Sequence, residues 1–364
     1  MSRNSRQVAR KAAVLPSDPY ESAKIAGLRY VQADGPGIAR KKAGAGFSFI
    51  GVDGQPVRDP QEIKRFHSLV IPPAWTNVWI CPSKNGHLQA VGRDARGRKQ
   101  YRYHPLYRAV RNATKFVRVA SFGEALPTIR KQVEQDLQLS GLPRRKVLAT
   151  VIRLLETTCI RVGNEEYVKE NHSYGLTTLR NKHLEIDGHR LRFHFRGKSG
   201  QTHDIELTDR KLAGIVRKCQ CLPGAELFHY VEPDGSIISK VCSEDVNEYL
   251  REVTGQEFTA KDFRTWVGTG QALLQLESLG PCSSEAQVKK NVVEAVKAVA
   301  GRLGNKPSTC RKYYMHPAVL DSYSDGSLFQ KMEACTDAGA PLRREEQCVL
   351  KLVQAIPVET MLAA

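Results

Sequence analysis

The chain has 364 residues, which is long enough for two or three domains of ordinary size. With 41% hydrophobic and 26% charged residues it has the composition of a globular protein, which excludes a largely disordered chain. Lys and Arg number 55 against 38 Asp and Glu, a formal net charge of +17. We expect a polyanionic partner, because phosphate binding releases counterions; a basic surface that serves only solubility is the alternative.

The nine cysteines are scattered and include no CxxC pair, which favours reduced thiols over a disulfide framework or a zinc site. No apolar run approaches the roughly 20 residues that span a membrane, so we expect no membrane association. Residues 1–16 are rich in Arg, contain no acidic residue and have no apolar core of a secretory signal. A mitochondrial presequence stays open; a basic flexible tail over residues 1–19 that touches DNA is the favoured interpretation.

Residues 20–110 predict a small antiparallel β-rich domain. Short apolar stretches are broken by Gly and Pro, and the dipeptides Asp53-Gly54 and Asn85-Gly86 are typical of hairpin turns. A connector rich in Arg and Lys follows, near residues 108–118.

From about residue 118 the pattern becomes helical. Apolar residues recur every three or four positions from Val147 to Thr158, and valines do so from Val288 to Val299, where Ser283 or Ser284 is a plausible N-cap and Gly304 marks the end. Between them, residues 183–207 alternate as strands and predict a three-stranded meander. The sequence thus indicates an α+β fold with a mainly helical domain over 118–335. The last 40 residues or so are expected to be irregular, and the tail 336–364 receives no role.

The stretch GRDARGRKQYRYH, residues 92–104, interleaves basic residues with tyrosines. In a strand, Lys99, Tyr101 and Tyr103 point to one face, which suits a surface that contacts phosphates and base edges. A half-buried strand with core tyrosines is the alternative.

Two basic residues stand at positions where they could meet a phosphate. Arg161, in RVGNEEY, follows the first helix directly and could clamp phosphate oxygens, although a salt bridge with Glu165 or Glu166 is the ordinary role of such a residue. Lys198 lies at the tip of the meander between two glycines, where its ammonium could protonate a leaving alkoxide; a solvated turn lysine is the ordinary role.

Five further residues to consider come from the helical region. TAKDFRTW places Lys261 and Arg264 among aromatic anchors, where Arg264 could equally form a structural cation–π pair. Asn305 follows Gly304, where its amide can cap the helix or reach a ligand. RKYYMHP contains Tyr313 and Tyr314. Two arginines, a lysine and a tyrosine are the groups that metal-free phosphoryl transfer to a phenol requires.

In their order and spacing, these motifs resemble those of the type IB DNA topoisomerases, in the short poxvirus-like form found in bacteria. The resemblance runs from about Tyr20 to Tyr323 and rests on GRDARGRKQYRYH, RVGNEEY, FRGKSG, TAKDFRTWVGT and CRKYYMHPAVLDSY. It implies a catalytic domain of the tyrosine recombinase and type IB topoisomerase kind. It also implies that a bacterial, cytoplasmic and nucleoid-associated monomer clamps duplex DNA, preferably supercoiled, and relaxes it with no ATP, metal or other cofactor.

The same resemblance assigns roles to the candidate residues. Tyr314 matches the nucleophile that forms a 3′-phosphotyrosyl link, Arg161 and Arg264 the phosphate-clamping arginines, Lys198 the general acid, and Lys261 an accessory basic residue. The residues expected to contact DNA are Arg98, Lys99, Gln100, Tyr101, Tyr103 and Tyr167. One position departs from the family: many members have a His nine residues before the nucleophile, where this chain has Asn305.

Two rival functions stay open at this stage. A tyrosine site-specific recombinase uses similar chemistry, but such enzymes typically show His-x-x-Arg where this chain has Lys261-x-x-Arg264. A non-catalytic DNA-binding relative is the second rival, and only Asn305 hints at it. Histidines 183, 189, 194 and 203 show no tight metal-ligand spacing and are predicted to lie on polar faces.

Overall fold

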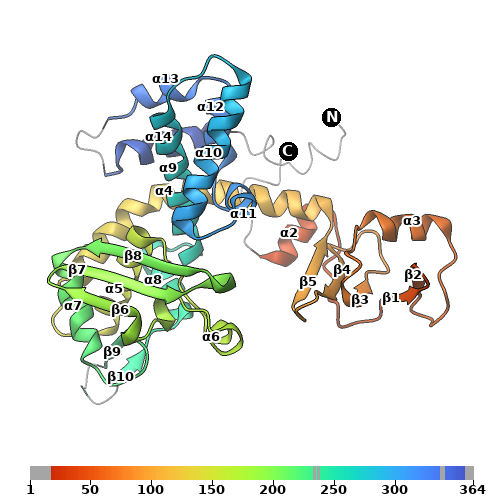
Figure 1. Cartoon of the computed structure of the whole chain (residues 1–364), viewed down its shortest axis with the longest axis horizontal. Coiled ribbons are helices and arrows are strands. Elements are labelled where there is room, and N and C mark those ends of the chain that lie inside the picture. The colour runs from red at the N-terminus through yellow and green to blue at the C-terminus, as the bar shows by residue number, and fades with distance from the viewer. Residues whose placement is uncertain (1–17, 233–234, 236–237, 337–340, 357–364) are drawn as a thin grey trace. The chain divides into compact units, whose positions relative to one another are not determined.

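The computed structural model describes residues 18–232, 235, 238–336 and 341–356, which include two compact units. The first unit extends to Val117 and the second from Arg118 to Ala355, and each is described by itself (Figure 1). No helix within the described part of the chain is long and apolar enough to cross a membrane. The predicted basic tail lies outside the described residues, except for Asp18 and Pro19.

The first unit is built on a five-stranded antiparallel sheet, as the sequence predicted, in the order β2-β1-β3-β4-β5 (Figure 1). Its strands are β1 (Ile38–Ala43), β2 (Gly46–Ile50), β3 (Thr76–Ile80), β4 (Leu88–Arg93) and β5 (Lys99–Tyr103). One face buries a small core against which helix α3 (Pro60–Ser68) packs through Phe66. The core residues are Ile38, Phe49, Phe66, Val78, Ile80 and Ala90.

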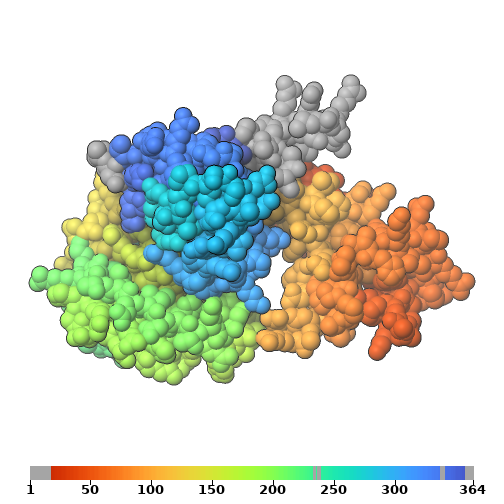
Figure 2. All heavy atoms as spheres, turned by 45° about the horizontal axis from the view of Figure 1, so that its top comes forward, coloured from red at the N-terminus to blue at the C-terminus, as the bar shows by residue number. Residues whose placement is uncertain are grey.

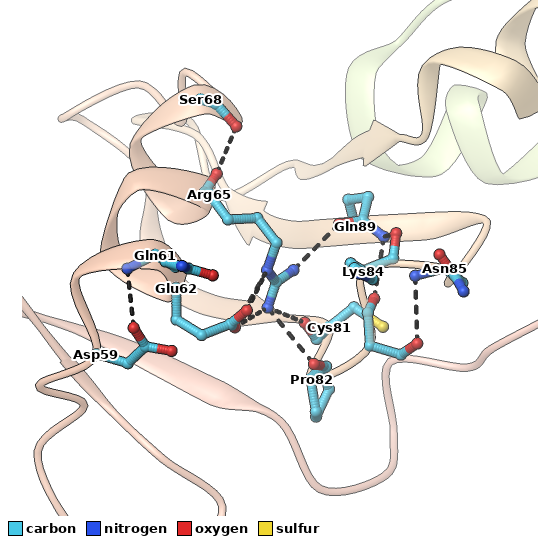
Figure 3. Close-up of polar contacts among 11 residues, drawn as sticks. Asp59, Gln61, Glu62, Arg65, Ser68, Cys81, Pro82, Lys84, Asn85 and Gln89 are labelled. Carbon is cyan, nitrogen blue, oxygen red and sulfur yellow. Dashed lines mark hydrogen bonds and ion pairs between the residues drawn. The ribbon is translucent and has the colours of Figure 1, made fainter.

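Arg65 of α3 makes polar contacts with the sheet in addition to the packing of Phe66 (Figure 3). Arg65 Nη2 pairs with Glu62 at 2.7 Å and also donates to the Cys81 carbonyl at 3.1 Å, whereas Nη1 donates to Gln89 Oε1 at 3.2 Å. Gln89 is buried and donates in turn to the Gly86 carbonyl at 2.8 Å. The loop between β3 and β4 is therefore fixed from the helix above it, which holds β4 in place for its pairing with β5.

Three helices of this region were not predicted. Asp18 caps α2 (Pro19–Ile25) and Asp59 caps α3, each followed by a proline at the first helical turn. The connector near residues 108–118 lies inside one continuous helix, α4 (Pro105–Asp136). The sequence analysis noted the basic residues of this stretch and overlooked its apolar residues. Several of these are buried, including Val110, Val119 and Phe122.

The second unit places the predicted three-stranded meander among helices. The strands β6 (Leu184–Asp187), β7 (Arg190–Arg196) and β8 (Thr202–Thr208) pair in sequence order, and the short 3-10 turn η3 (Lys198–Gly200) joins the last two (Figure 1). Ten of the 15 residues of α5 (Arg144–Thr158) are buried, which makes it a central helix of this unit. The second predicted helix is α10 (Glu285–Leu303), capped by Ser284 and ended by left-handed Gly304.

The remaining elements of the second unit are mostly helical. They are α6 (Glu165–Asn171), η1 (Leu176–Thr178), η2 (Asn181–His183), α7 (Arg210–Gln220), β9 (His229–Val231), β10 (Ile238–Lys240), α8 (Ser243–Thr254), α9 (Ala260–Leu279), α11 (Pro307–Tyr313), α12 (Pro317–Ser324), α13 (Leu328–Glu333) and α14 (Arg344–Gln354). The α+β class predicted from the sequence is confirmed.

The prediction that the last 40 residues are irregular was wrong. They include α13 and α14, and α14 buries Cys348, Val349 and Leu352. Arg130 of α4 holds α14 through Glu346 at 2.6 Å and also pairs with Glu156 of α5. Burial would raise the pKa of Glu346, but the hydrogen bond and charge of Arg130 lower it, so the ion pair persists at neutral pH.

Candidate functional site

Helix α9 carries one side of the candidate site. The Arg264 guanidinium carbon stands 5.2 Å from the centre of the Tyr314 ring. One turn later Gly268 lies against the Tyr314 backbone, because a Cβ there would come within 2.4 Å of the Tyr314 carbonyl oxygen. The Thr269 hydroxyl then accepts a hydrogen bond from the His316 amide at 3.1 Å. Three consecutive contacts along one helix thus fix the position of Tyr314.

Arg264 is only 4% exposed, and backbone carbonyls orient it. Its Nη1 donates to the Cys159 carbonyl and its Nη2 to the Leu303 carbonyl at 2.7 Å, whereas its buried Nε has no hydrogen-bond partner among the described residues. A buried donor without a partner costs about 1–3 kcal/mol. The guanidinium is therefore held rigidly with donor capacity to spare.

Arg161 is placed by an unusual turn after α5. Cys159 ends the helix in the left-handed conformation, with φ of 58°, which is uncommon for a residue other than glycine and costs about 1–2 kcal/mol. The Arg161 carbonyl then accepts from the Leu176 amide at 2.8 Å, and Gly175 packs so closely that a Cβ would lie 2.5 Å from that oxygen. Local strain of this kind is concentrated at functional sites.

The Arg161 side chain connects to the Asn305 turn. Its Nη2 donates to the Gly304 carbonyl at 2.9 Å and to Asn305 Oδ1 at 2.5 Å. The salt bridge with Glu165 considered from the sequence is absent from the described residues, where Glu165 pairs with Lys240 instead. Asn305 Nδ2 is buried and has no partner within the described ranges, so a second donor is left unsatisfied.

The electrostatics favour an anion between these groups. Burial, followed by the charge of Arg264, lowers the pKa of Arg161 to about 10. No carboxylate of the described residues comes within ion-pair distance of either Arg161 or Arg264. Two guanidinium groups and an amide donor without a counter-charge form a site that a phosphodiester would complete.

Two of the predicted site residues are not in contact with this cluster. Lys198 is exposed at the tip of the meander, and its ammonium stands 5.4 Å from the centre of the Tyr167 ring on α6. Lys261 is exposed in the first turn of α9, three residues before Arg264. Tyr313 is exposed, and the Lys312 ammonium lies 5.2 Å from the centre of its ring.

The predicted DNA-contact residues of the first unit lie on β5 and the turn before it. Tyr101 and Tyr103 are 45% and 39% exposed, so the alternative that they are core residues is wrong. Their rings stack at 5.9 Å, and the Lys99 ammonium lies 5.8 Å from the Tyr101 ring on the same face, as the alternation predicted. We call Lys99, Tyr101 and Tyr103 the β5 surface.

Sequence reasoning missed the groups that support this surface. Asp94 pairs with Arg98 at 2.7 Å and accepts from Gln100 at 3.0 Å, which orients both predicted contact residues. Buried His87 lies between the rings of Tyr30 and Tyr107, at 4.3 Å and 4.7 Å, and extends the row of aromatic rings behind Tyr103. The alternating tyrosines were visible in the sequence. The supporting residues, Asp94 directly after β4 and His87 directly before it, were not predicted.

The histidine prediction was wrong for two residues. His183 is buried against Tyr174 and accepts a hydrogen bond from the Arg180 amide, so it does not lie on a polar face. His203 lies on the inner face of β8, stacked on Phe195 at 5.0 Å, and not on the polar face. None of the nine cysteines, all of which lie among the described residues, forms a disulfide. The described residues contain no cluster of three or more His, Cys, Asp or Glu that could hold a metal.

In this mainly helical unit with a three-stranded meander, a phenol lies against a buried guanidinium, and these are groups that could act on a phosphate. The family model described as eukaryotic DNA topoisomerase I, catalytic core, matches residues 104–338. The model described as bacterial DNA topoisomerase IB, N-terminal domain, matches residues 46–94.

Individual relatives agree with these matches. DNA topoisomerase 1B of Acanthamoeba polyphaga mimivirus is 32% identical over 80% of this chain and 89% of its own length. DNA topoisomerase 1B of vaccinia virus (strain Copenhagen) is 28% identical over 68% of this chain and 76% of its own length. The chain belongs to the type IB DNA topoisomerase family. It is therefore a DNA topoisomerase, an isomerase whose substrate is DNA.

Proposed function

We propose that this topoisomerase relaxes supercoiled duplex DNA by cleaving one strand through Tyr314, without ATP and without a required metal ion. The observation that supports this most directly is the Arg264 guanidinium beside the Tyr314 ring, together with the contact of Arg161 with the Asn305 amide. Buried donors at Arg264 Nε and Asn305 Nδ2 have no partner among the described residues. Those donors match the oxygens of a phosphodiester.

The reaction follows from these groups. The Tyr314 oxygen attacks the phosphorus and its proton leaves to solvent, while the bond from phosphorus to the 5′ oxygen breaks. Arg161, Arg264 and Asn305 stabilise the negative charge on the non-bridging oxygens. Lys198, on its flexible four-carbon side chain at the hairpin tip, swings from Tyr167 to give a proton to the departing 5′ oxygen.

The product is a 3′-phosphotyrosyl link and a free 5′-hydroxyl end. One phosphodiester has replaced another, so the bond energy is retained and the reverse reaction reseals the strand. Between the two steps torsional stress rotates the duplex. The β5 surface and Tyr167 contact the DNA, Lys261 adds positive charge near the site, and the enzyme acts as a monomer on DNA of the bacterial nucleoid.

The test uses supercoiled plasmid in excess EDTA without ATP, with wild-type protein, Tyr314→Phe and Tyr313→Phe. We expect relaxation by the wild type and by Tyr313→Phe, and none by Tyr314→Phe. Loss of relaxation with Tyr313→Phe alone would assign the wrong phenol. DNA binding without relaxation by any of them would favour a tyrosine recombinase or a non-catalytic relative, which a paired-site recombination assay separates.

A further inference from the structure

His203 lies between two turns that each carry a residue of the proposed site. A Cβ on Gly197 would come within 2.5 Å of the His203 Cδ2 atom and 2.6 Å of Nε2. A Cβ on Gly304 would come within 2.4 Å of Cε1. Both glycines are buried, so the imidazole touches two closely approaching backbones at once. Figure 2 shows the blue segment that includes α11 directly above the green segment of the meander.

Each of these glycines immediately precedes a proposed site residue. Gly197 is followed by Lys198, and Gly304 by Asn305. Gly197 also closes the hairpin, because its amide donates to the Gln201 carbonyl at 2.7 Å. The Gly304 carbonyl accepts from Arg161 at 2.9 Å. The ring of His203 is thus one contact away from the lysine, the asparagine and the first arginine.

We infer that His203 is a positioning residue, whose imidazole holds the Lys198 hairpin against the Gly304–Asn305 turn so that the general acid and the phosphate-binding groups meet the same phosphodiester. This inference rests on the proposed function of Lys198 and Asn305. Phe195 supports the ring from its strand partner β7, stacked at 5.0 Å and 17°. Ring, strand and both glycines together form a rigid connection across otherwise separate segments.

The ring acts through its shape and not through its charge. Burial, followed by the charges of Arg161 and Arg264, lowers the pKa of His203, so that the imidazole is neutral at pH 7. A neutral planar ring fits between two glycine backbones without adding a third positive charge to the arginine pair. A long, flexible cationic side chain would add that charge and would not fit between the two backbones in this way.

The first arm of the experiment measures single-turnover cleavage by His203→Ala on two substrates. One carries the natural 5′ oxygen at the scissile bond and the other a 5′ sulfur, whose thiolate leaves without needing a proton. We expect a loss of roughly 100-fold on the oxygen substrate, because misplacement by about 1 Å costs that much, and a loss several-fold smaller on the sulfur substrate. Noncovalent DNA affinity should stay within about twofold, because the ring is not expected to contact DNA.

Ile205→Ala is the matched control. Ile205 is the next inward residue of β8 and pairs with Phe193, so its truncation destabilises the same strand without touching Gly197 or Gly304. We expect Ile205→Ala to lower the melting temperature while the oxygen-to-sulfur rate ratio stays that of the wild type. An equal loss on both substrates with His203→Ala, or no loss, would overturn the inference.

The second arm does not depend on activity. Amide hydrogen exchange should accelerate in His203→Ala both at the Gly197 amide and at the Asn305 amide, which donates to the Ala300 carbonyl at 2.9 Å. Unchanged exchange at either turn would also overturn the inference. If the wild type failed to cleave DNA, the proposed function would fall, while exchange would still decide whether His203 holds the two turns together.

Discussion

The two regions proposed to contact DNA satisfy their polar groups in opposite ways. On the β5 surface the side chains are exposed, and the neighbouring Arg98 has an acidic partner, Asp94, at 2.7 Å. In the second unit Arg264 is 4% exposed, donates hydrogen bonds to two backbone carbonyls, and has an Nε without a hydrogen-bond partner among the described residues. One region is a solvated surface, and the other is a buried set of donors without a counter-charge.

This difference indicates that one region contributes mainly to DNA affinity and the other mainly to the cleavage rate. Exposed charges act through counterion release, which is sensitive to salt and tolerant of position. Buried donors act through fixed geometry in a low-dielectric site, where each is worth more and a small displacement is costly. We therefore expect substitutions in the second unit to change the cleavage rate at constant affinity, and substitutions on the β5 surface to do the reverse.

The largest effect should come from Arg264→Lys. The three donors of an ammonium sit on one nitrogen, so a lysine cannot take the places of Nη1, Nη2 and Nε, which the planar fork of Arg264 holds at separate positions. We expect single-turnover cleavage to fall about 10³-fold, as when one donor of an anion site is removed, with DNA affinity changed less than about threefold. Rapid-quench cleavage beside a binding titration measures both quantities.

Arg302→Lys is the matched control for Arg264→Lys, because Arg302 is an exposed arginine of α10 that pairs with Gln271. It should cleave like the wild type. Equal losses of affinity and of cleavage rate in Arg264→Lys would break the division between the two regions.

A smaller effect is expected from Gly268→Ala. The added methyl group would lie 2.4 Å from the Tyr314 carbonyl oxygen, so the backbone that carries the nucleophile must move away from α9. We expect cleavage to fall about 10-fold to 100-fold. The control is Gly270→Ala, two residues further along the same helix, where nothing lies within 4 Å and alanine favours the helix.

The two glycine variants separate position from helix propensity. Single-turnover rates and melting temperatures are measured for both. If Gly270→Ala slowed cleavage as much as Gly268→Ala, the tight contact between α9 and Tyr314 would not explain the loss.

Sequence patterns predicted the structure correctly where the residues of a single helix or strand determine it. Strand alternation placed Lys99, Tyr101 and Tyr103 on one face, and the spacing of valines with Ser284 and Gly304 gave α10. The predictions failed where contacts with residues distant in the sequence determine the structure. The α4 connector is helical because its apolar residues are buried, and α14 is held by Glu346 to Arg130, 216 positions earlier.

The candidate site divides in the same way. Its residue types follow from motifs and from the family resemblance, whereas its orientation depends on contacts that no local pattern reveals. The left-handed turn at Cys159 has no glycine to mark it, and His203 alternates as an ordinary strand residue. Gly304 was predicted only as the end of a helix, and its close approach to the His203 ring depends on a contact that the sequence does not reveal.

On the β5 surface we expect Lys99→Ala to weaken DNA binding about fivefold at 0.15 M salt and to reduce the slope of log affinity against log salt by about 1. Cleavage at saturating protein should not change, because Lys99 lies outside the arginine site. Lys84→Ala removes the same charge from the exposed loop before β4 and should leave the slope unchanged. Equal slopes for both variants would mean that net charge, and not this surface, binds the DNA.

The smallest effect is expected from Asn305→His, and it tests whether the buried site needs charge or only a donor. Asn305 cannot become cationic, so the wild type should show no pH transition from this position. In Asn305→His the imidazole gains its charge as the pH falls through its pKa, which Arg161 and Arg264 should hold below the usual value of about 6.5, in the direction in which they shift His203. The ratio of the variant's cleavage rate to that of the wild type should therefore rise a few-fold on the acid side and be near one above pH 7.

Asn305→Ala completes this comparison, because it removes both the acceptor for Arg161 and the unpaired Nδ2 donor. We expect it to cleave about 10-fold more slowly than the wild type at every pH, a loss that corresponds to about one hydrogen bond to a charged group. Unchanged single-turnover cleavage in both variants would remove Asn305 from the site and leave the arginines and Lys198 as the groups that stabilise the reacting phosphate.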